Sequence, residues 1–69
     1  MKLEWLDGFK LSVKNDNNEI VIKGNKEALL SLARQLEVLA LEEEGSHIHY
    51  DKYNSLEDDS IDMIIEKGE

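Results

Sequence analysis

The sequence predicts an α+β fold in which two strands, one long helix and two further strands follow one another. Three observations support this order. Residues 9–23 alternate apolar and polar side chains around an asparagine-rich turn, residues 26–44 contain strong helix formers without glycine or proline, and residues 47–50 and 61–66 are rich in β-forming side chains. We expect a four-stranded, mostly antiparallel sheet with the helix packed on one face, in a single domain spanning residues 1–69.

The first two strands are expected to form a hairpin. Residues 9–14 alternate in the way typical of a strand buried on one face, and the segment before them is treated as an extension of this strand. Residues 15–18 tolerate the left-handed conformations of a tight turn, and residues 19–23 resume a β-rich pattern. With Asp16 and Asn17 at the tip, charge would pair with charge and apolar with apolar. The resulting pairs are Lys14 with Glu19, Val13 with Ile20 and Leu11 with Ile22.

One helix of about five turns is predicted over residues 26–44. Asn25 precedes it as a suitable N-cap, and Gly45 follows where a glycine commonly closes a helix. Apolar residues recur at steps of three and four and form the stripe expected to cover the sheet. This stripe contains Leu29, Leu32, Ala33, Leu36, Leu39 and Ala40.

A second hairpin is predicted from residues 47–50 and 61–66, joined by a polar loop over residues 51–60. Side chains alternate along each strand, so the apolar residues of both strands would share the buried face. Matching side-chain polarity gives the expected register. It pairs Tyr50 with Ile61, Ile48 with Met63 and His49 with Asp62.

Both histidines of the chain lie on this hairpin. His47 and His49 are two residues apart, so both would point away from the buried face. At this spacing they could bind a metal ion, with Asp62 or Glu66 as oxygen ligands. The open face of a sheet offers no enclosed pocket, so we expect exposed or partner-contacting histidines and no cofactor.

Composition narrows the class of protein. The 69 residues include no cysteine, which excludes disulfides and thiolate metal sites and is typical of the reducing cytoplasm. No apolar stretch approaches the roughly 18 residues of a membrane span, and no signal-peptide pattern is present, so a soluble cytoplasmic protein is expected. No nucleophile, phosphate-binding or dinucleotide-binding motif is found, and we do not expect an enzyme.

Charge is distributed unevenly along a chain whose net charge is −8. Residues 1–35 contain six basic and five acidic residues, whereas residues 36–69 contain two basic and eleven acidic ones. The second half therefore carries −9. Binding to nucleic acid is not expected, because phosphate contacts require a basic surface, and a basic protein partner suits this charge better.

The candidate partner-binding residues are the acidic clusters and the histidines between them. Residues 42–44 are predicted in the last helical turn, where the helix macrodipole disfavours negative charge, and such local conflicts often mark functional sites. The simpler interpretation is a solvated acidic face that keeps the protein soluble. The candidate set is Glu42, Glu43, Glu44, His47, His49, Asp51, Glu57, Asp58, Asp59 and Asp62.

Three stretches between residues 20 and 67 resemble the immunity protein 32 family of bacterial polymorphic toxin systems. They are residues 23–33, 45–51 and 60–67, and the most specific is Gly45-Ser46-His47-Ile48-His49-Tyr50-Asp51. Ser46, His47, His49 and Ser60 match signature positions, whereas Asp59 stands where the family pattern has a glycine. The resemblance implies a small α+β protein that binds and neutralises a cognate toxin, often a nuclease, without catalysis.

We therefore expect an immunity protein that covers a basic active-site region of its toxin with the acidic second half of the chain. Two alternatives stay open. One is a small metal-binding protein that uses His47 and His49. The other is a homodimer formed through the open sheet face or through an exposed edge strand.

Overall fold

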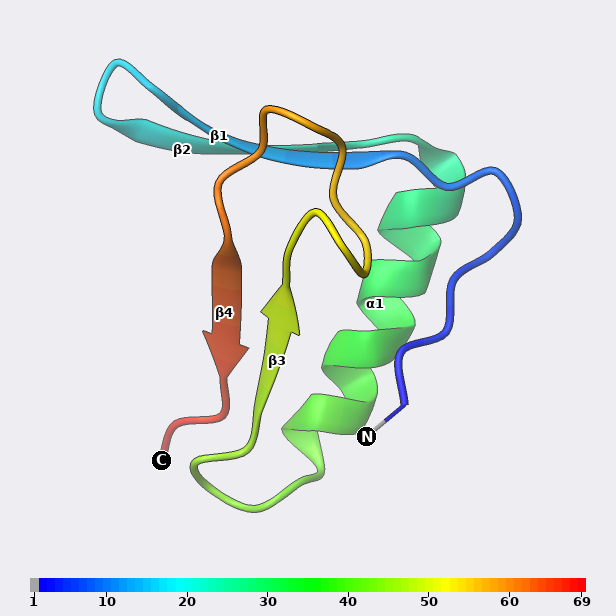
Figure 1. Ribbon diagram of the computed structural model, residues 1–69. Coiled ribbons are helices and arrows are strands. Elements are labelled where there is room, and N and C mark those ends of the chain that lie inside the picture. Colours follow the sequence, from blue (N-terminus) through cyan, green and yellow to red (C-terminus); the bar gives the residue numbers. More distant parts are fainter. Residues whose placement is uncertain (1) are drawn as a thin grey trace.

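The structure, a computed structural model, describes residues 2–69 as one helix and two pairs of strands (Figure 1). One antiparallel sheet contains β1 (Leu11–Asp16) and β2 (Glu19–Gly24), and α1 (Lys26–Ala40) follows it. A second antiparallel sheet contains β3 (His47–Tyr50) and β4 (Met63–Glu66). The predicted α+β class and ββαββ order are confirmed, but the four strands form two separate pairs instead of one continuous sheet.

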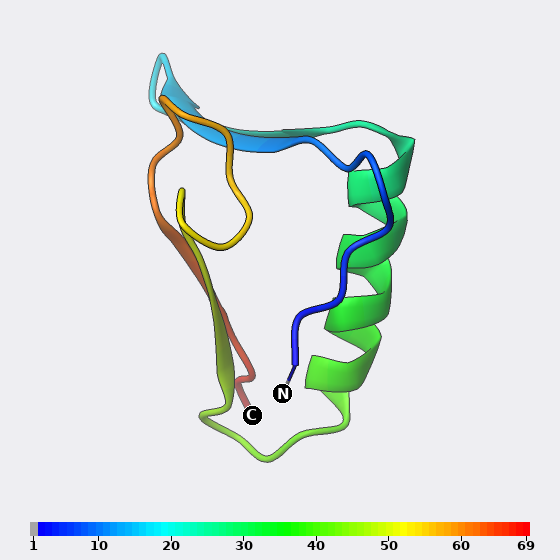
Figure 2. The ribbon, with the colours of Figure 1, turned by 45° about the vertical axis from the view of Figure 1, so that its right-hand side comes forward.

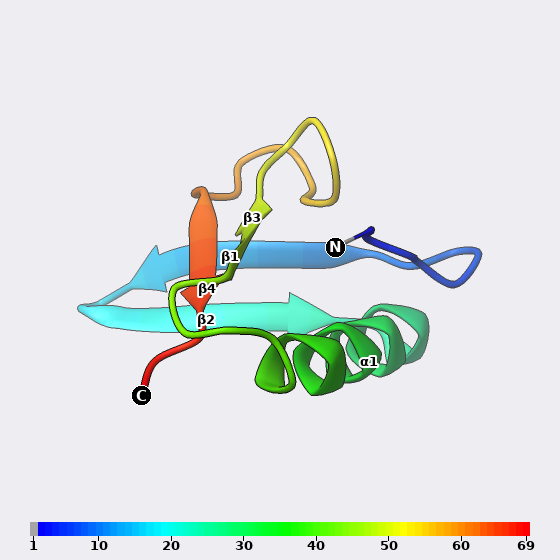
Figure 3. The ribbon, with the colours of Figure 1, turned by 90° about the horizontal axis from the view of Figure 1, so that it is seen from below.

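The three parts of the molecule surround a common core. The β1–β2 hairpin lies across one end, α1 descends from it on one side, and the β3–β4 hairpin lies on the opposite side (Figure 2). Seen from below, β3 and β4 run across the direction of β1 and β2 (Figure 3). The segment before β1 runs alongside the helix, so the interior is closed by four pieces of chain (Figure 2).

The loop between β3 and β4 explains why the sheets do not merge. The main-chain N–H groups of Glu57 and Ile61 donate to the carbonyls of Leu11 and Val13, each at 2.8 Å, and the N–H of Val13 donates to Ser60 Oγ at 3.2 Å. The loop thereby occupies the outer edge of β1 that β3 or β4 would need for pairing. Backbone groups at that edge are satisfied without a continuous ladder.

The register predicted for the first hairpin is wrong by two residues; Leu11 and Val13 of β1 point inward as predicted, whereas Ile20 and Ile22 of β2 stay exposed. Val13 pairs with Ile22, and Leu11 pairs with Gly24. The turn is formed by Asn17 and Asn18, whose φ angles are 54° and 68°. A two-residue hairpin turn matched to the strand twist needs left-handed conformations at both positions, and two asparagines provide them.

The second hairpin also differs from its predicted register by two residues. Tyr50 pairs with Met63, Ile48 with Ile65, His49 with Ile64 and His47 with Glu66. Ile61, expected opposite Tyr50, bonds instead to the edge of β1, so the fourth strand begins at Met63. The prediction that Ile48 and Tyr50 point inward and both histidines outward is confirmed.

The core contains residues from β1, α1, β3 and the loop after β3, and residues of β4 and of the segment before β1 pack against it. Trp5 stacks on Phe9 with ring centroids 4.3 Å apart and meets Tyr50 edge-on at 6.2 Å. This segment is not an extension of β1, as predicted, but an irregular stretch that packs on the core. The buried apolar residues are Leu11, Val13, Ala28, Leu32, Leu39, Ile48, Tyr50 and Leu56.

The buried face of α1 differs from the predicted stripe. Leu32 and Leu39 are buried as expected, but Leu29 and Leu36 are 50% and 37% exposed, and Ala33 and Ala40 are exposed as well. The helix instead turns Ala28, Ser31 and Gln35 inward. The reason is the segment before β1, which requires polar partners: Leu6 N donates to Ser31 Oγ at 2.9 Å, and Gln35 Nε2 donates to Glu4 O at 3.0 Å.

The helix also ends four residues before the predicted position, at Ala40. Three consecutive glutamates at the negative end of the helix macrodipole would repel it and one another, which disfavours a further turn. The Lys67 side chain donates to the carbonyl of Ala40, so a cation from the end of β4 complements the helix terminus. Gly45, with φ of 92°, lies in the loop that follows and donates to Lys67 O at 2.9 Å.

Candidate functional site

The strongest cluster of like charge lies where α1 leads into β3. Glu42, Glu43 and Glu44 are exposed and, together with Gly45, Ser46 and His47, line a shallow depression of ≈ 480 Å³. We call these six residues the acidic end. The helix stops at Ala40, so the glutamates belong to a loop and not to the last helical turn, as predicted. The acidic end contains no lysine or arginine.

The acids of the loop between β3 and β4 have different surroundings. Glu57 and Asp58 share a depression with three lysines: Lys14 on β1, Lys23 on β2 and Lys10, which directly precedes β1. These lysines oppose the loop's negative charge, so this part of the surface is of mixed sign. Asp59 has φ of 74°, a left-handed conformation that favours glycine, which fits the glycine expected at this position from the family pattern.

The predicted site residues therefore do not form one acidic surface. The chain from 42 to 46 and the loop from 51 to 60 lie at opposite ends of the β3–β4 hairpin (Figure 1). Asp51 is half-buried and accepts hydrogen bonds from the N–H groups of Tyr53 and Asn54, both at 2.9 Å. It thus shapes the loop, whereas Asp62 is exposed just before β4.

The two histidines lie on the outer face of β3, next to the acidic end. Their ring centroids are 4.9 Å apart at an interplanar angle of 71°, and His47 Nδ1 lies 3.0 Å from Gly45 O, to which it donates. His49 lies opposite Ile64, so the predicted pair with Asp62 is wrong. Within residues 2–69, no group of three or more histidine, cysteine, aspartate or glutamate side chains is placed to hold a metal ion.

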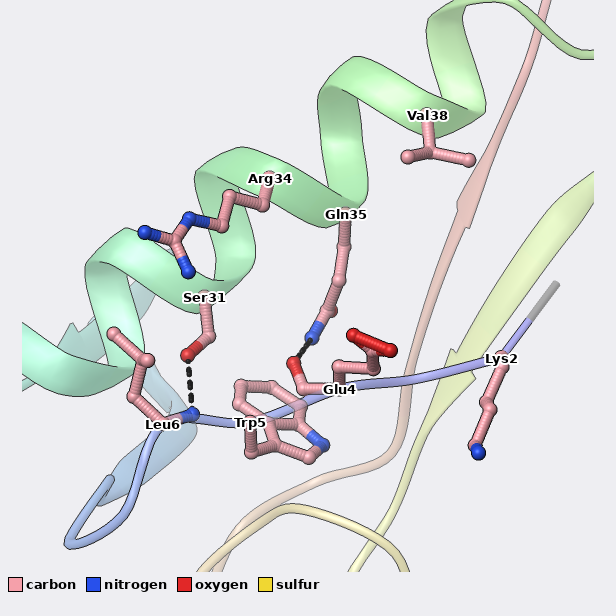
Figure 4. Close-up of a pocket in the computed structure, with 8 residues that line it drawn as sticks. All are labelled: Lys2, Glu4, Trp5, Leu6, Ser31, Arg34, Gln35 and Val38. Atoms are coloured by element: carbon pink, nitrogen blue, oxygen red, sulfur yellow. Dashed lines mark hydrogen bonds between the residues drawn. The ribbon is translucent and has the colours of Figure 1, made fainter.

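A further depression, which the sequence did not indicate, lies between α1 and the segment before β1 (Figure 4). It has a volume of ≈ 390 Å³, and Lys2 and Arg34 line it beside Trp5. Its polar floor, Ser31 and Gln35, already binds the main chain of that segment. The sequence gives no signal for it, because polar residues within a helix sequence look the same whether they are buried or exposed.

Burial changes the acidity of one residue in the core beneath the site. The Tyr50 side chain is fully buried, and its hydroxyl donates to Gln35 Oε1 at 2.9 Å. Desolvation disfavours the phenolate and raises the pKa of Tyr50 from 10.0 to about 12. Tyr50 is therefore a neutral structural residue that holds β3 in place beneath the exposed histidines.

Comparison with known proteins identifies the family. The sequence profile of immunity protein 32 matches residues 19–68 of the 69-residue chain. No curated protein and no solved structure matches the chain. In residues 2–69, no helix combines the length and apolar character needed to cross a membrane. Because the profile spans β2, α1, the acidic end and the second hairpin, the chain belongs to the immunity protein 32 family.

Proposed function

We propose that this immunity protein neutralises a cognate toxin of a polymorphic toxin system by binding it through the acidic end and the adjoining outer face of β3. The observation that supports this most directly is the run Glu42, Glu43 and Glu44, three exposed carboxylates with no lysine or arginine among the residues that line their depression. His47 and His49 extend the same surface. The acids of the 51–60 loop contribute less to binding, because lysines face two of them.

The charge of the acidic end fits a basic surface on the toxin. A toxin that cleaves nucleic acid must hold phosphates with basic residues, so its active-site region attracts a cluster of carboxylates. An inhibitor that covers this region blocks the substrate without any catalytic group of its own. Opposite charges on the two surfaces also speed their encounter.

Co-expression with the toxin encoded beside the gene tests whether the protein is its inhibitor. We expect cells to survive toxin induction only when the immunity protein is present, and the two proteins to be purified as one complex. Continued toxicity, with no complex detected by size-exclusion chromatography, would contradict the proposal.

Two matched triple variants test where the toxin binds. Glu42→Lys, Glu43→Lys and Glu44→Lys together raise the net charge from −8 to −2, and so do Glu57→Lys, Asp58→Lys and Asp62→Lys. All six side chains are exposed, so both variants should fold. We expect the first variant to weaken toxin binding at least about 100-fold, since close charge pairs at interfaces contribute several kcal/mol, and the second to weaken it far less.

Isothermal titration calorimetry with catalytically inactive toxin measures both affinities, and circular dichroism checks the fold. Equal losses in the two variants would mean that only net charge matters. A larger loss in the second variant would place the interface at the 51–60 loop.

A further inference from the structure

The outer edge of β2 is an unpaired strand edge. Leu11 and Val13 direct their main-chain groups toward the 57–61 segment and hence away from β2. In an antiparallel pair of strands, two residues that lie opposite each other either both direct their N–H and C=O toward the partner strand or both direct them away. Ile22 lies opposite Val13, so it also directs its N–H and C=O outward. The alternation repeats every second residue and places Ile20 likewise. Within residues 2–69, β2 pairs with β1 alone.

The side chains along this edge are apolar and exposed. Ile20, Val21 and Ile22 are 59%, 43% and 42% exposed. Ile20 and Ile22 lie on the same face of the hairpin as the core residue Val13, yet both remain exposed. An exposed apolar edge strand is a template for pairing with another chain, and soluble proteins usually protect such an edge.

The sequence of β2 is complementary to itself. An antiparallel pair of β2 strands related by a two-fold axis at Val21 would place Glu19 opposite the partner's Lys23, and Ile20 opposite the partner's Ile22. Each of these pairs would occur twice. The strand carries one acid and one base in this stretch and lies in the half of the chain that is nearly neutral, so the net charge of −8 does not oppose pairing here.

The direction of the main-chain groups agrees with the same axis. Residues that exchange two hydrogen bonds across an antiparallel pair must both direct their N–H and C=O toward the partner. Ile20 and Ile22 have this direction, and they are the two residues that the axis at Val21 brings opposite each other. Hydrogen-bond geometry thus permits this register, and side-chain complementarity distinguishes it from the registers centred on Ile20 or Ile22.

We propose that the protein forms a two-fold symmetric dimer through the outer edges of β2, in which the two β1–β2 hairpins join into one four-stranded antiparallel sheet. The occupant of the edge is a second copy of this chain. This dimer goes beyond toxin binding and needs no toxin. The acidic end lies at the far end of α1 from the hairpin, so both copies would keep it accessible (Figure 1).

Charge-swap variants test the register of the dimer by sedimentation equilibrium over a range of protein concentrations. We expect wild type to dimerise. Glu19→Lys and Lys23→Glu should each replace two attractive pairs with two repulsive ones and raise the dissociation constant about tenfold or more. The double swap should restore the wild-type value. An equimolar mixture of the two single variants should form the heterodimer, because each then faces the opposite charge.

Val21→Lys places two like charges at the axis and should give a monomer. Val38→Lys is the matched control, since Val38 is 49% exposed on α1 and far in sequence from β2. A wild-type protein that sediments as a monomer would overturn the proposal. A monomer whose β2 amides are protected only when toxin is bound would overturn it too, because the edge would then pair with the toxin. So would a dimer that all the β2 variants leave unchanged, and circular dichroism confirms that each variant is folded.

Discussion

Tyr50 links three parts of the core through a chain of hydrogen bonds. Its hydroxyl donates to Gln35 Oε1 on α1, and Gln35 Nε2 donates to the carbonyl of Glu4 in the segment before β1. The ring also meets the edge of Trp5. The strand pattern predicts an inward Tyr50, but neither Gln35 nor Glu4 is identifiable as its partner, because polar residues within a helix sequence look the same whether buried or exposed.

Stability should fall at alkaline pH because Tyr50 titrates later in the folded protein. Its unfolded-state pKa is 10.0 and burial raises the folded-state pKa to about 12. The unfolded state therefore releases this proton first, and the stabilisation present below pH 10 is lost between pH 10 and 12 at about 1.4 kcal/mol per pH unit. Urea unfolding of wild type, Tyr50→Phe and Tyr53→Phe measures this slope.

Tyr53 is the control because it is 95% exposed. All other titratable groups are common to the three proteins, so the comparison between variants isolates the contribution of Tyr50. Tyr50→Phe should lose the slope that Tyr50 contributes, and Tyr53→Phe should keep it. Parallel curves for wild type and Tyr50→Phe would show that burial of the phenol is not the cause.

At the scale of elements, Asn25 joins the end of β2, the start of α1 and the segment before β1. Its Oδ1 accepts from the N–H groups of Ala28 and Lys10, both at 3.0 Å, and its Nδ2 donates to Gly8 O at 2.9 Å. The N-cap is confirmed as predicted from sequence. Its two other bonds were not predictable, since they depend on how the segment before β1 folds back.

Two substitutions of Asn25 separate these roles. Asn25→Asp keeps the acceptor oxygen for the cap and for Lys10 but loses the donor to Gly8, so we expect a loss of about 1 kcal/mol or less. Asn25→Ala loses all three bonds and should cost about 2 kcal/mol. Chemical denaturation of both variants gives the difference, and equal losses would assign the effect to the Gly8 bond alone.

Local patterns predict the elements better than they predict their assembly. Alternation and turn residues predict both hairpins and the inward faces of β1 and β3. Each register is shifted by two, because the apolar pattern repeats at that interval and only the turn or the loop decides between the two registers. The end and buried face of α1 depend on Lys67 and on the segment before β1, both distant in sequence. The predicted site residues likewise lie at two separate places, because their positions depend on how the elements assemble.

For the molecule as a whole, the acidic end is a concentrated charge at one extremity. We expect the rate of association with toxin to fall about tenfold or more between low and high salt, because screening weakens long-range attraction. Stopped-flow fluorescence with inactive toxin measures it. The triple variant at Glu42–Glu44 should lose most of this salt dependence, and the variant at 57, 58 and 62 should keep most of it. A wild-type association rate that does not change with salt would contradict electrostatic steering.

The segment that covers the outer edge of β1 limits how far such chains can assemble. A hairpin with two open edges could add copies without end and polymerise into a fibre. Here Glu57, Ser60 and Ile61 occupy one edge, so the β1–β2 hairpin keeps one edge for addition, and growth through this hairpin would stop at the proposed pair. The bonds that separate the two sheets thus also end sheet growth at the β1 edge of this hairpin.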